Sequence, residues 1–228
     1  AAVHYSPHTM KSLRVLALGA LWSNRPASAT TFANPTLSPT SVVLTPSPGP
    51  STTSTPTSIP SIGAATSALW DLYLNTGGPS WVNKANWLTG DPCHPFQPWY
   101  GLSCSGEGDV TSSVISLNLG ANGLVGALPS QIGLVSTLTA FQVDQNSLSS
   151  SLPSQLATLS SLSSTFALQS NQFEQKIPSE LGLLTVLQSD MFLHSNSFDG
   201  AIPSQLGQLT SLSSDFRLYS NILSGAIP

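Results

Sequence analysis

The chain has 228 residues, enough for one or two ordinary domains, and only 7% of them are charged. From residue 30 onward it holds three basic and ten acidic side chains, so the net charge of that part is −7. A surface that binds nucleic acid or anionic lipid needs clustered Lys and Arg, and this composition argues against both partners.

The first 29 residues are arranged like a secretory signal peptide. Basic Lys11 and Arg14 follow Met10, an apolar run occupies 15–22, and 27–29 is a small-residue cleavage site. A disordered N-terminus with a chance apolar run is the alternative. The run is too short to span a bilayer, and no later stretch approaches the roughly 20 apolar residues required. We therefore expect a secreted or cell-surface protein with no membrane insertion in these residues.

Residues 30–61 form a Ser/Thr/Pro-rich segment. They include seven Ser, nine Thr and seven Pro among 32 residues, with few apolar side chains to bury. We expect a disordered linker of the type often O-glycosylated outside the cell, although a plain unmodified linker fits equally well.

A helix is predicted at the start of the next segment, which begins at residue 62. Apolar residues recur there at helical spacing, and Gly77-Gly78 ends the pattern. The recurring residues are Ala65, Ala68, Leu69, Leu72 and Tyr73.

Two cysteines follow this helix among several tryptophans. Ten residues separate Cys93 from Cys104, which suggests a local disulfide in a secreted chain. A metal site using Cys93, His94 and Cys104 is the alternative, but it lacks a fourth ligand at a familiar spacing. We therefore expect no metal and no cofactor.

A repeat of about 25 residues fills the rest of the chain. Its marker is an asparagine at intervals of 24, 25, 25 and 25 residues, each followed seven residues later by proline. Four apolar columns keep register with it, five and three residues before the asparagine and two and six after. The marker residues are Asn122, Asn146, Asn171, Asn196 and Asn221.

This register predicts a solenoid. Apolar residues two apart describe a short strand with alternate side chains pointing inward, and the asparagine amide then satisfies backbone groups in a turn. One such coil buries too little apolar surface to offset the entropy of ordering its backbone, so neighbouring coils must stack.

The unit at 196–209, Asn-x-Leu/Phe-x-Gly-x-Ile-Pro-Ser-x-Leu-Gly-x-Leu, resembles plant-type leucine-rich repeats. The segments Asn86-Trp87-Leu88 and Asp91-Pro92-Cys93 to Cys104 resemble the N-terminal cap of that family, found on receptor-like kinase ectodomains, polygalacturonase-inhibiting proteins and algal relatives.

The resemblance implies an α/β-type solenoid, a right-handed superhelix with short parallel strands on its concave face. It implies a small helical, disulfide-bonded cap at 62–113 and repeats at 114–228 that continue beyond Pro228. Ser150 and Gln175 replace a glycine of the repeat, so we expect slightly irregular curvature there.

The outward strand positions stand six, four and two residues before each marker asparagine. Adjacent strands place column neighbours about 4.8 Å apart, so Phe192 should neighbour Arg217, and His194 should neighbour Tyr219. We expect charged and aromatic side chains there to bind a protein, peptide or carbohydrate ligand. A surface cation–π pair on a solvated face is the alternative. The candidate residues are Gln142, Asp144, Gln169, Asp190, Phe192, His194, Asp215, Arg217 and Tyr219.

An enzymatic role is disfavoured. Asp190, His194 and Ser195 contain the letters of a catalytic triad, but a strand would point His194 outward with no pocket or oxyanion hole. A kinase domain beyond Pro228 stays open. The favoured function is an extracellular recognition scaffold, a piece of a receptor-like protein or receptor kinase ectodomain. The alternative is a secreted wall-associated structural, enzyme-inhibitor or ice-binding protein.

Overall fold

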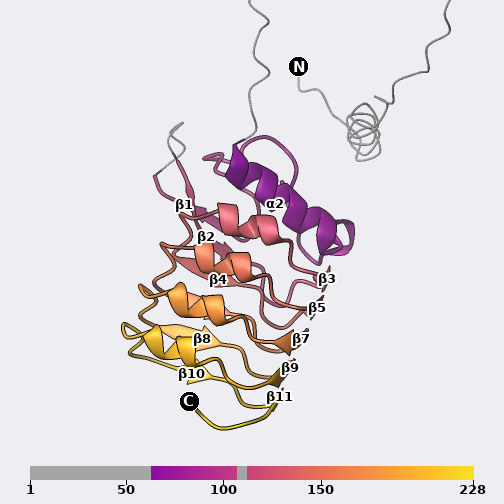
Figure 1. Ribbon diagram of the computed structural model, residues 1–228. Helices are drawn as coiled ribbons and strands as arrows, with labels where there is room; N and C mark the ends of the chain where they lie inside the picture. Colours follow the sequence, from indigo (N-terminus) through magenta and orange to yellow (C-terminus); the bar gives the residue numbers. More distant parts are fainter. Residues whose placement is uncertain (1–62, 107–111) are drawn as a thin grey trace, which may run out of the picture. The chain divides into compact units, whose positions relative to one another are not determined.

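The structure is a computed structural model that describes residues 63–106 and 112–228 (Figure 1). The predicted leader at 1–29 and the predicted linker at 30–61 lie outside the described residues. None of the described helices has the length and apolar character needed to cross a membrane.

The described part begins with helix α2 (Ala64–Asn75), which buries the apolar face expected from the sequence. The helix ends where Thr76 Oγ1 donates a hydrogen bond to the Leu72 carbonyl at 2.7 Å. Gly77 then takes a left-handed backbone with φ of 72°, which glycine adopts without steric cost. A short 3₁₀ helix, η1 (Gly78–Ser80), follows.

Aromatic rings fill the space between α2 and the following loops. The Trp81 ring lies 5.0 Å from Tyr73 and 4.8 Å from Trp87, and the Trp87 ring lies 5.0 Å from Trp99. All four side chains are buried, and the three indole N–H groups donate to backbone carbonyls. Paired indole N–H groups allow these large side chains to be buried without a desolvation penalty.

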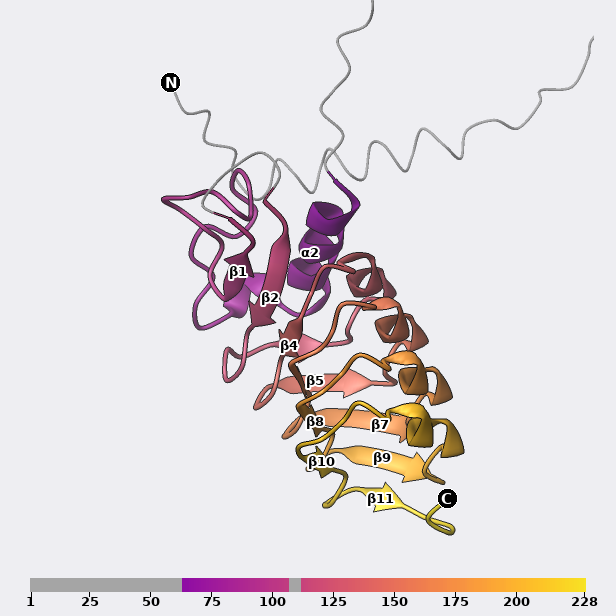
Figure 2. The same cartoon turned by 90° about the vertical axis from the view of Figure 1, so that its left-hand side faces the viewer.

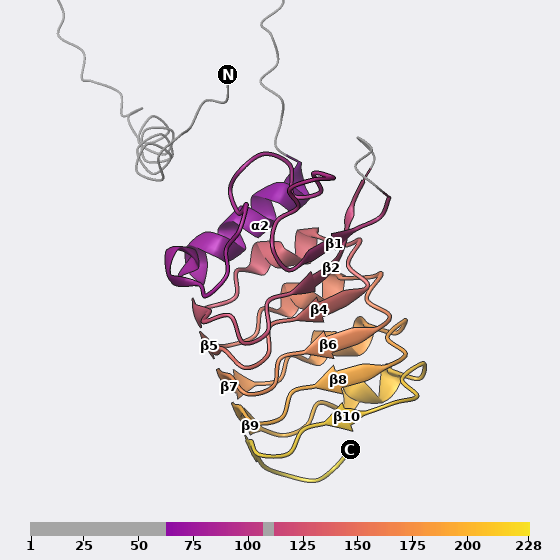
Figure 3. The same cartoon turned by 180° about the vertical axis from the view of Figure 1, so that it is seen from behind.

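The repeats stack through a six-stranded sheet of order β1-β2-β4-β6-β8-β10 (Figure 3). Strand β1 pairs antiparallel with β2, and the others pair in parallel. The strands are β1 (Leu102–Cys104), β2 (Val114–Asn118), β4 (Ala140–Gln142), β6 (Thr165–Ala167), β8 (Asp190–Phe192) and β10 (Phe216–Arg217).

A second sheet, of order β11-β9-β7-β5-β3, is a feature that the sequence reasoning missed (Figure 2). It is formed by the residues that follow each marker asparagine. Its strands are β3 (Val125–Gly126), β5 (Ser147–Ser150), β7 (Gln172–Lys176), β9 (Ser197–Gly200) and β11 (Ile222–Leu223).

Each coil returns from the second sheet to the first through a short 3₁₀ helix. The repeat proline immediately precedes each of these helices in an extended conformation. The helices are η2 (Ser130–Leu134), η3 (Ser154–Thr158), η4 (Ser179–Leu183) and η5 (Ser204–Gln208). The predicted solenoid with a helical cap is thus confirmed.

The core lies between the two sheets and the 3₁₀ helices. Pairing puts Leu117, Phe141, Phe166 and Met191 in one column of the first sheet, and all four are fully buried. Phe216 continues the column on β10 but is 40% exposed.

The marker asparagines tie each coil to the one before it. Asn196 Nδ2 donates to the carbonyls of Leu168 and Leu193, and its Oδ1 accepts from the Phe173 amide at 3.1 Å. Asn122 makes the corresponding bonds to Asn83 and so joins the cap to the first repeat. These bonds satisfy backbone groups that the turns leave without sheet partners.

The two residues that replace the repeat glycine keep its left-handed backbone conformation. Ser150 and Gln175 take left-handed φ values of 70° and 66°, close to the 70° of Gly200 in the next repeat. The substitution is therefore absorbed as local backbone strain.

Candidate binding surface

The outward-facing residues of the first sheet form what we call the strand face. Pairing aligns Ser116, Ala140, Thr165 and Asp190 in one row, as the repeat register requires. The backbone hydrogen bonds continue past the ends of β8 and β10. The Leu193 amide donates to the Arg217 carbonyl, and the Ser195 amide donates to the Tyr219 carbonyl.

A second row consists of Asn118, Gln142, Ala167, Phe192 and Arg217. Its middle member departs from the sequence expectation, because Ala167 is only 2% exposed. Its methyl group lies between the longer side chains of Gln142 and Phe192 on the neighbouring strands, and both of those are half-buried.

Four side chains near β8 and β10 make an aromatic cluster, defined by Phe192, His194, Arg217 and Tyr219. The Arg217 guanidinium lies 4.9 Å from the Phe192 ring centre, a cation–π distance. The His194 ring stacks on Tyr219 at 4.4 Å and meets Phe192 edge-on at 5.8 Å. Tyr219 is 58% exposed, so the cluster offers an open aromatic surface.

Carboxylates surround the cluster. Asp215, immediately before β10, pairs with Arg217 on that strand, and both side chains are about half exposed. Asp190 Oδ1 accepts a hydrogen bond from the Ser214 hydroxyl at 3.2 Å.

Farther along the face, burial raises the pKa of the Asp144 carboxyl group above its usual value. A side chain on Gly120 would come within 2.9 Å of that carboxylate, so glycine leaves it room. Gln169 follows Asp144 in the same row and is half-buried.

His194 is neutral at pH 7. Burial lowers the pKa of its imidazole below the usual 6.5, and the positive charge of Arg217 lowers it further. The cluster therefore carries one positive charge, which Asp215 balances.

The structure does not form a catalytic triad from Asp190, His194 and Ser195. Asp190 contacts Ser214, His194 contacts two rings, and Ser195 has a left-handed φ of 55° in the turn before its asparagine. Within residues 63–106 and 112–228, no hydrogen bond joins the three side chains.

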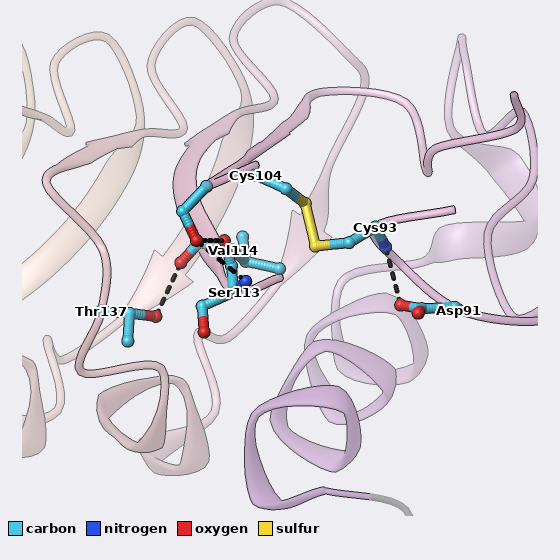
Figure 4. Close-up of a disulfide and its surroundings, with 7 residues drawn as sticks. Asp91, Cys93, Cys104, Ser113, Val114 and Thr137 are labelled. Atoms are coloured by element: carbon cyan, nitrogen blue, oxygen red, sulfur yellow. Dashed lines mark hydrogen bonds between the residues drawn. A yellow bond between two sulfur atoms is a disulfide. The ribbon is translucent and has the colours of Figure 1, made fainter. Parts of the chain in front are cut away.

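Cys93 and Cys104 form the disulfide expected from their spacing, with Cα atoms 5.8 Å apart (Figure 4). Both thiols are consumed, which removes two ligands of the alternative metal site. In the described part of the chain, no three His, Cys, Asp or Glu side chains are grouped to hold a metal. An open hollow beside the disulfide, lined by His94, Phe96 and Leu102 among others, lies in the cap and not on the strand face.

Stacked coils, each with a short parallel strand, a buried asparagine and a 3₁₀ return, define a leucine-rich-repeat solenoid. No family model matches the sequence. The fold is similar to a chain in the BIR3–SERK2 complex of Arabidopsis thaliana, at TM-score 0.60 and 30% identity over 71% of this chain and 84% of that one. The chain belongs to the plant-type leucine-rich-repeat proteins, and the solved structures similar to it include receptor ectodomains.

Two further comparisons bear on function. The LRR receptor-like serine/threonine-protein kinase IOS1 of Arabidopsis thaliana is 35% identical over 74 residues, 32% of this chain and 8% of that protein. The chain spans less than a tenth of the length of the curated relatives it matches. A plant ice-binding protein is similar at TM-score 0.59 and 25% identity, over 70% of this chain and 49% of that one.

Proposed function

We propose that this chain is an extracellular recognition module that binds a protein or peptide partner through the strand face around the aromatic cluster. The main observation behind this proposal is a set of ring contacts on this face. The His194 ring contacts both the Phe192 and the Tyr219 rings, while Tyr219 remains largely exposed to solvent. Packing in the core fixes the inward columns, and the outward positions are free to serve binding.

The energetics of interfaces favour this part of the face. Aromatic and arginine side chains dominate binding energy when a partner excludes water around them. The cluster holds two aromatic rings, a histidine and an arginine on or just after the adjacent strands β8 and β10, and their mutual contacts reduce the entropy lost on binding. The similarity to receptor ectodomains supports a receptor-like protein of the cell surface.

Paired affinity capture tests the proposal. The full chain and its Phe192→Ala/Tyr219→Ala variant would be used as baits for plant extracellular proteins and peptides, with quantitative mass spectrometry. A genuine partner is recovered by the unsubstituted chain and depleted at least tenfold on the variant. Equal recovery on both baits would contradict the site.

Ice binding is the second candidate, because one similar structure is an ice-binding protein. Such a function would use a repetitive Ser/Thr-rich face, and β5 does present Ser147, Ser149 and Ser150. The next strands, β7 and β9, carry Glu174 and Asp199, so the array is interrupted by charge. Thermal hysteresis of the purified chain would support this candidate against the first.

A further inference from the structure

The charges of the strand face do not balance. Asp215 is paired with Arg217, which leaves Asp144 and Asp190 without an ion-pair partner among the described residues. Because His194 is neutral at pH 7, this surface carries two uncompensated negative charges.

We propose that the ligand of this surface is a cationic, extended peptide segment whose basic side chains pair with Asp144 and Asp190 while an apolar side chain packs on the aromatic cluster. This inference rests on the proposed function and adds the chemistry of the ligand to it.

Both carboxylates are suited to receive a cation. Asp190 is half-buried, and its carboxylate accepts a hydrogen bond from the neutral hydroxyl of Ser214. Burial disfavours the charged form of Asp144, so an incoming ammonium or guanidinium group would restore the interactions lost with water. An anionic ligand is less suited, because Asp215 and the Phe192 ring already occupy the Arg217 guanidinium.

The geometry also predicts the spacing of the basic residues. Asp144 follows β4 and Asp190 begins β8, so they are two strand spacings apart and differ by four positions along the strand direction. At about 4.8 Å per strand and about 3.3 Å per residue, their separation is on the order of 16 Å. An extended peptide covers that distance in about five residues.

The rest of the protein adds a long-range contribution. The full chain has a formal net charge of −4 at pH 7, which attracts cationic ligands and accelerates their association at low salt. The same field repels acidic polysaccharides.

Selection from a displayed library of random 12-residue peptides, with the full 228-residue chain as bait, tests the inference. We expect Lys and Arg to be enriched at least twofold over the starting library, with pairs about five residues apart. We also expect no binding of polygalacturonate. Enrichment of acidic peptides, or binding of polygalacturonate, would overturn the inference.

Two matched double variants locate the contact. Asp144→Asn/Asp190→Asn should weaken the selected peptides about tenfold, since each exposed ion pair contributes up to about fivefold. Glu174→Gln/Asp199→Asn alters net charge equally but on the second sheet, and should weaken them less than twofold. Equal losses in both would mean general attraction and would refute the pairing.

Failure of the inference can be told apart from failure of the proposed function. If the selected peptides are neutral and bind the Phe192→Ala variant more weakly, the proposed site is supported and the cationic ligand is excluded. If Phe192→Ala and Asp144→Asn/Asp190→Asn leave the affinity of the selected peptides unchanged, or if no peptide is selected, both the inference and the proposed function are contradicted.

Discussion

At the scale of single residues, backbone strain is the most direct consequence of the repeat. Ser150 and Gln175 have left-handed φ values, a conformation that costs an L-residue about 1–2 kcal/mol. Glycine removes that cost, but its greater backbone freedom stabilises the unfolded chain by about 0.5–1 kcal/mol. Each change to glycine should therefore raise the free energy of unfolding by about 0.5–1 kcal/mol, measured by urea denaturation. Ser149→Gly, one position away, should lower it.

The marker asparagines have a larger effect. Asn196→Ala removes the acceptor of the Phe173 amide and the donor to the Leu168, Leu193 and His194 carbonyls, leaving backbone groups without partners. We expect the free energy of unfolding to fall by about 2–3 kcal/mol. Ser197→Ala, at the exposed neighbouring position, should change it by less than about 0.5 kcal/mol. A similar small effect of both substitutions would show that the asparagine bonds are dispensable.

His194 makes stability depend on pH. Its pKa is lowered in the folded chain, so the unfolded chain takes up the proton at a higher pH. The contribution of His194 is therefore lost as pH falls from 6.5 through the lower folded pKa. NMR titration of the imidazole should give a midpoint below 6.5, and Arg217→Gln should move it upward. A midpoint at or above 6.5 would contradict the burial of the imidazole and the effect of the Arg217 charge on it.

At the scale of elements, the disulfide joins the cap loop to the sheet. Cys104 lies on β1, which pairs with β2, and Cys93 lies in the loop between Trp87 and Trp99. The Cys93→Ser/Cys104→Ser variant should lose about 3 kcal/mol of stability by the chain-entropy estimate for so short a loop. Denaturant unfolding measures the loss, and thiol labelling of the denatured, unreduced protein should find no free cysteine. Two labelled cysteines would refute the bond.

Elements with a strong apolar period were predictable. The residues at helical spacing from Ala65 to Tyr73 lie in α2, and the inward columns lie in the first sheet. The second sheet was not predictable in the same way, because strands such as β5 and β9 contain one buried apolar residue each, Leu148 and Phe198. Such short segments acquire strand geometry from the neighbouring coil, not from their own alternation.

At the scale of the whole molecule, the repeat made it possible to predict from the sequence which side chains are neighbours on the strand face. A constant register predicts which side chains are neighbours, and Phe192–Arg217 and His194–Tyr219 are indeed in contact. Register does not predict burial. The near-complete burial of Ala167 and the fit of Asp144 over Gly120 depend on the sizes of neighbouring side chains. The ligand likewise depends on the outward positions, which the fold leaves free.

The most direct test of a recognition role is the dissociation constant of a selected peptide or captured partner for the full chain, measured by isothermal titration calorimetry. Phe192→Ala or Tyr219→Ala should raise it roughly thirtyfold, because burying one such ring contributes about 2 kcal/mol. Ser116→Ala, in the first repeat of the same face, should leave it unchanged. An unchanged constant in the Phe192→Ala/Tyr219→Ala variant, with the fold intact by circular dichroism, would contradict recognition by the strand face.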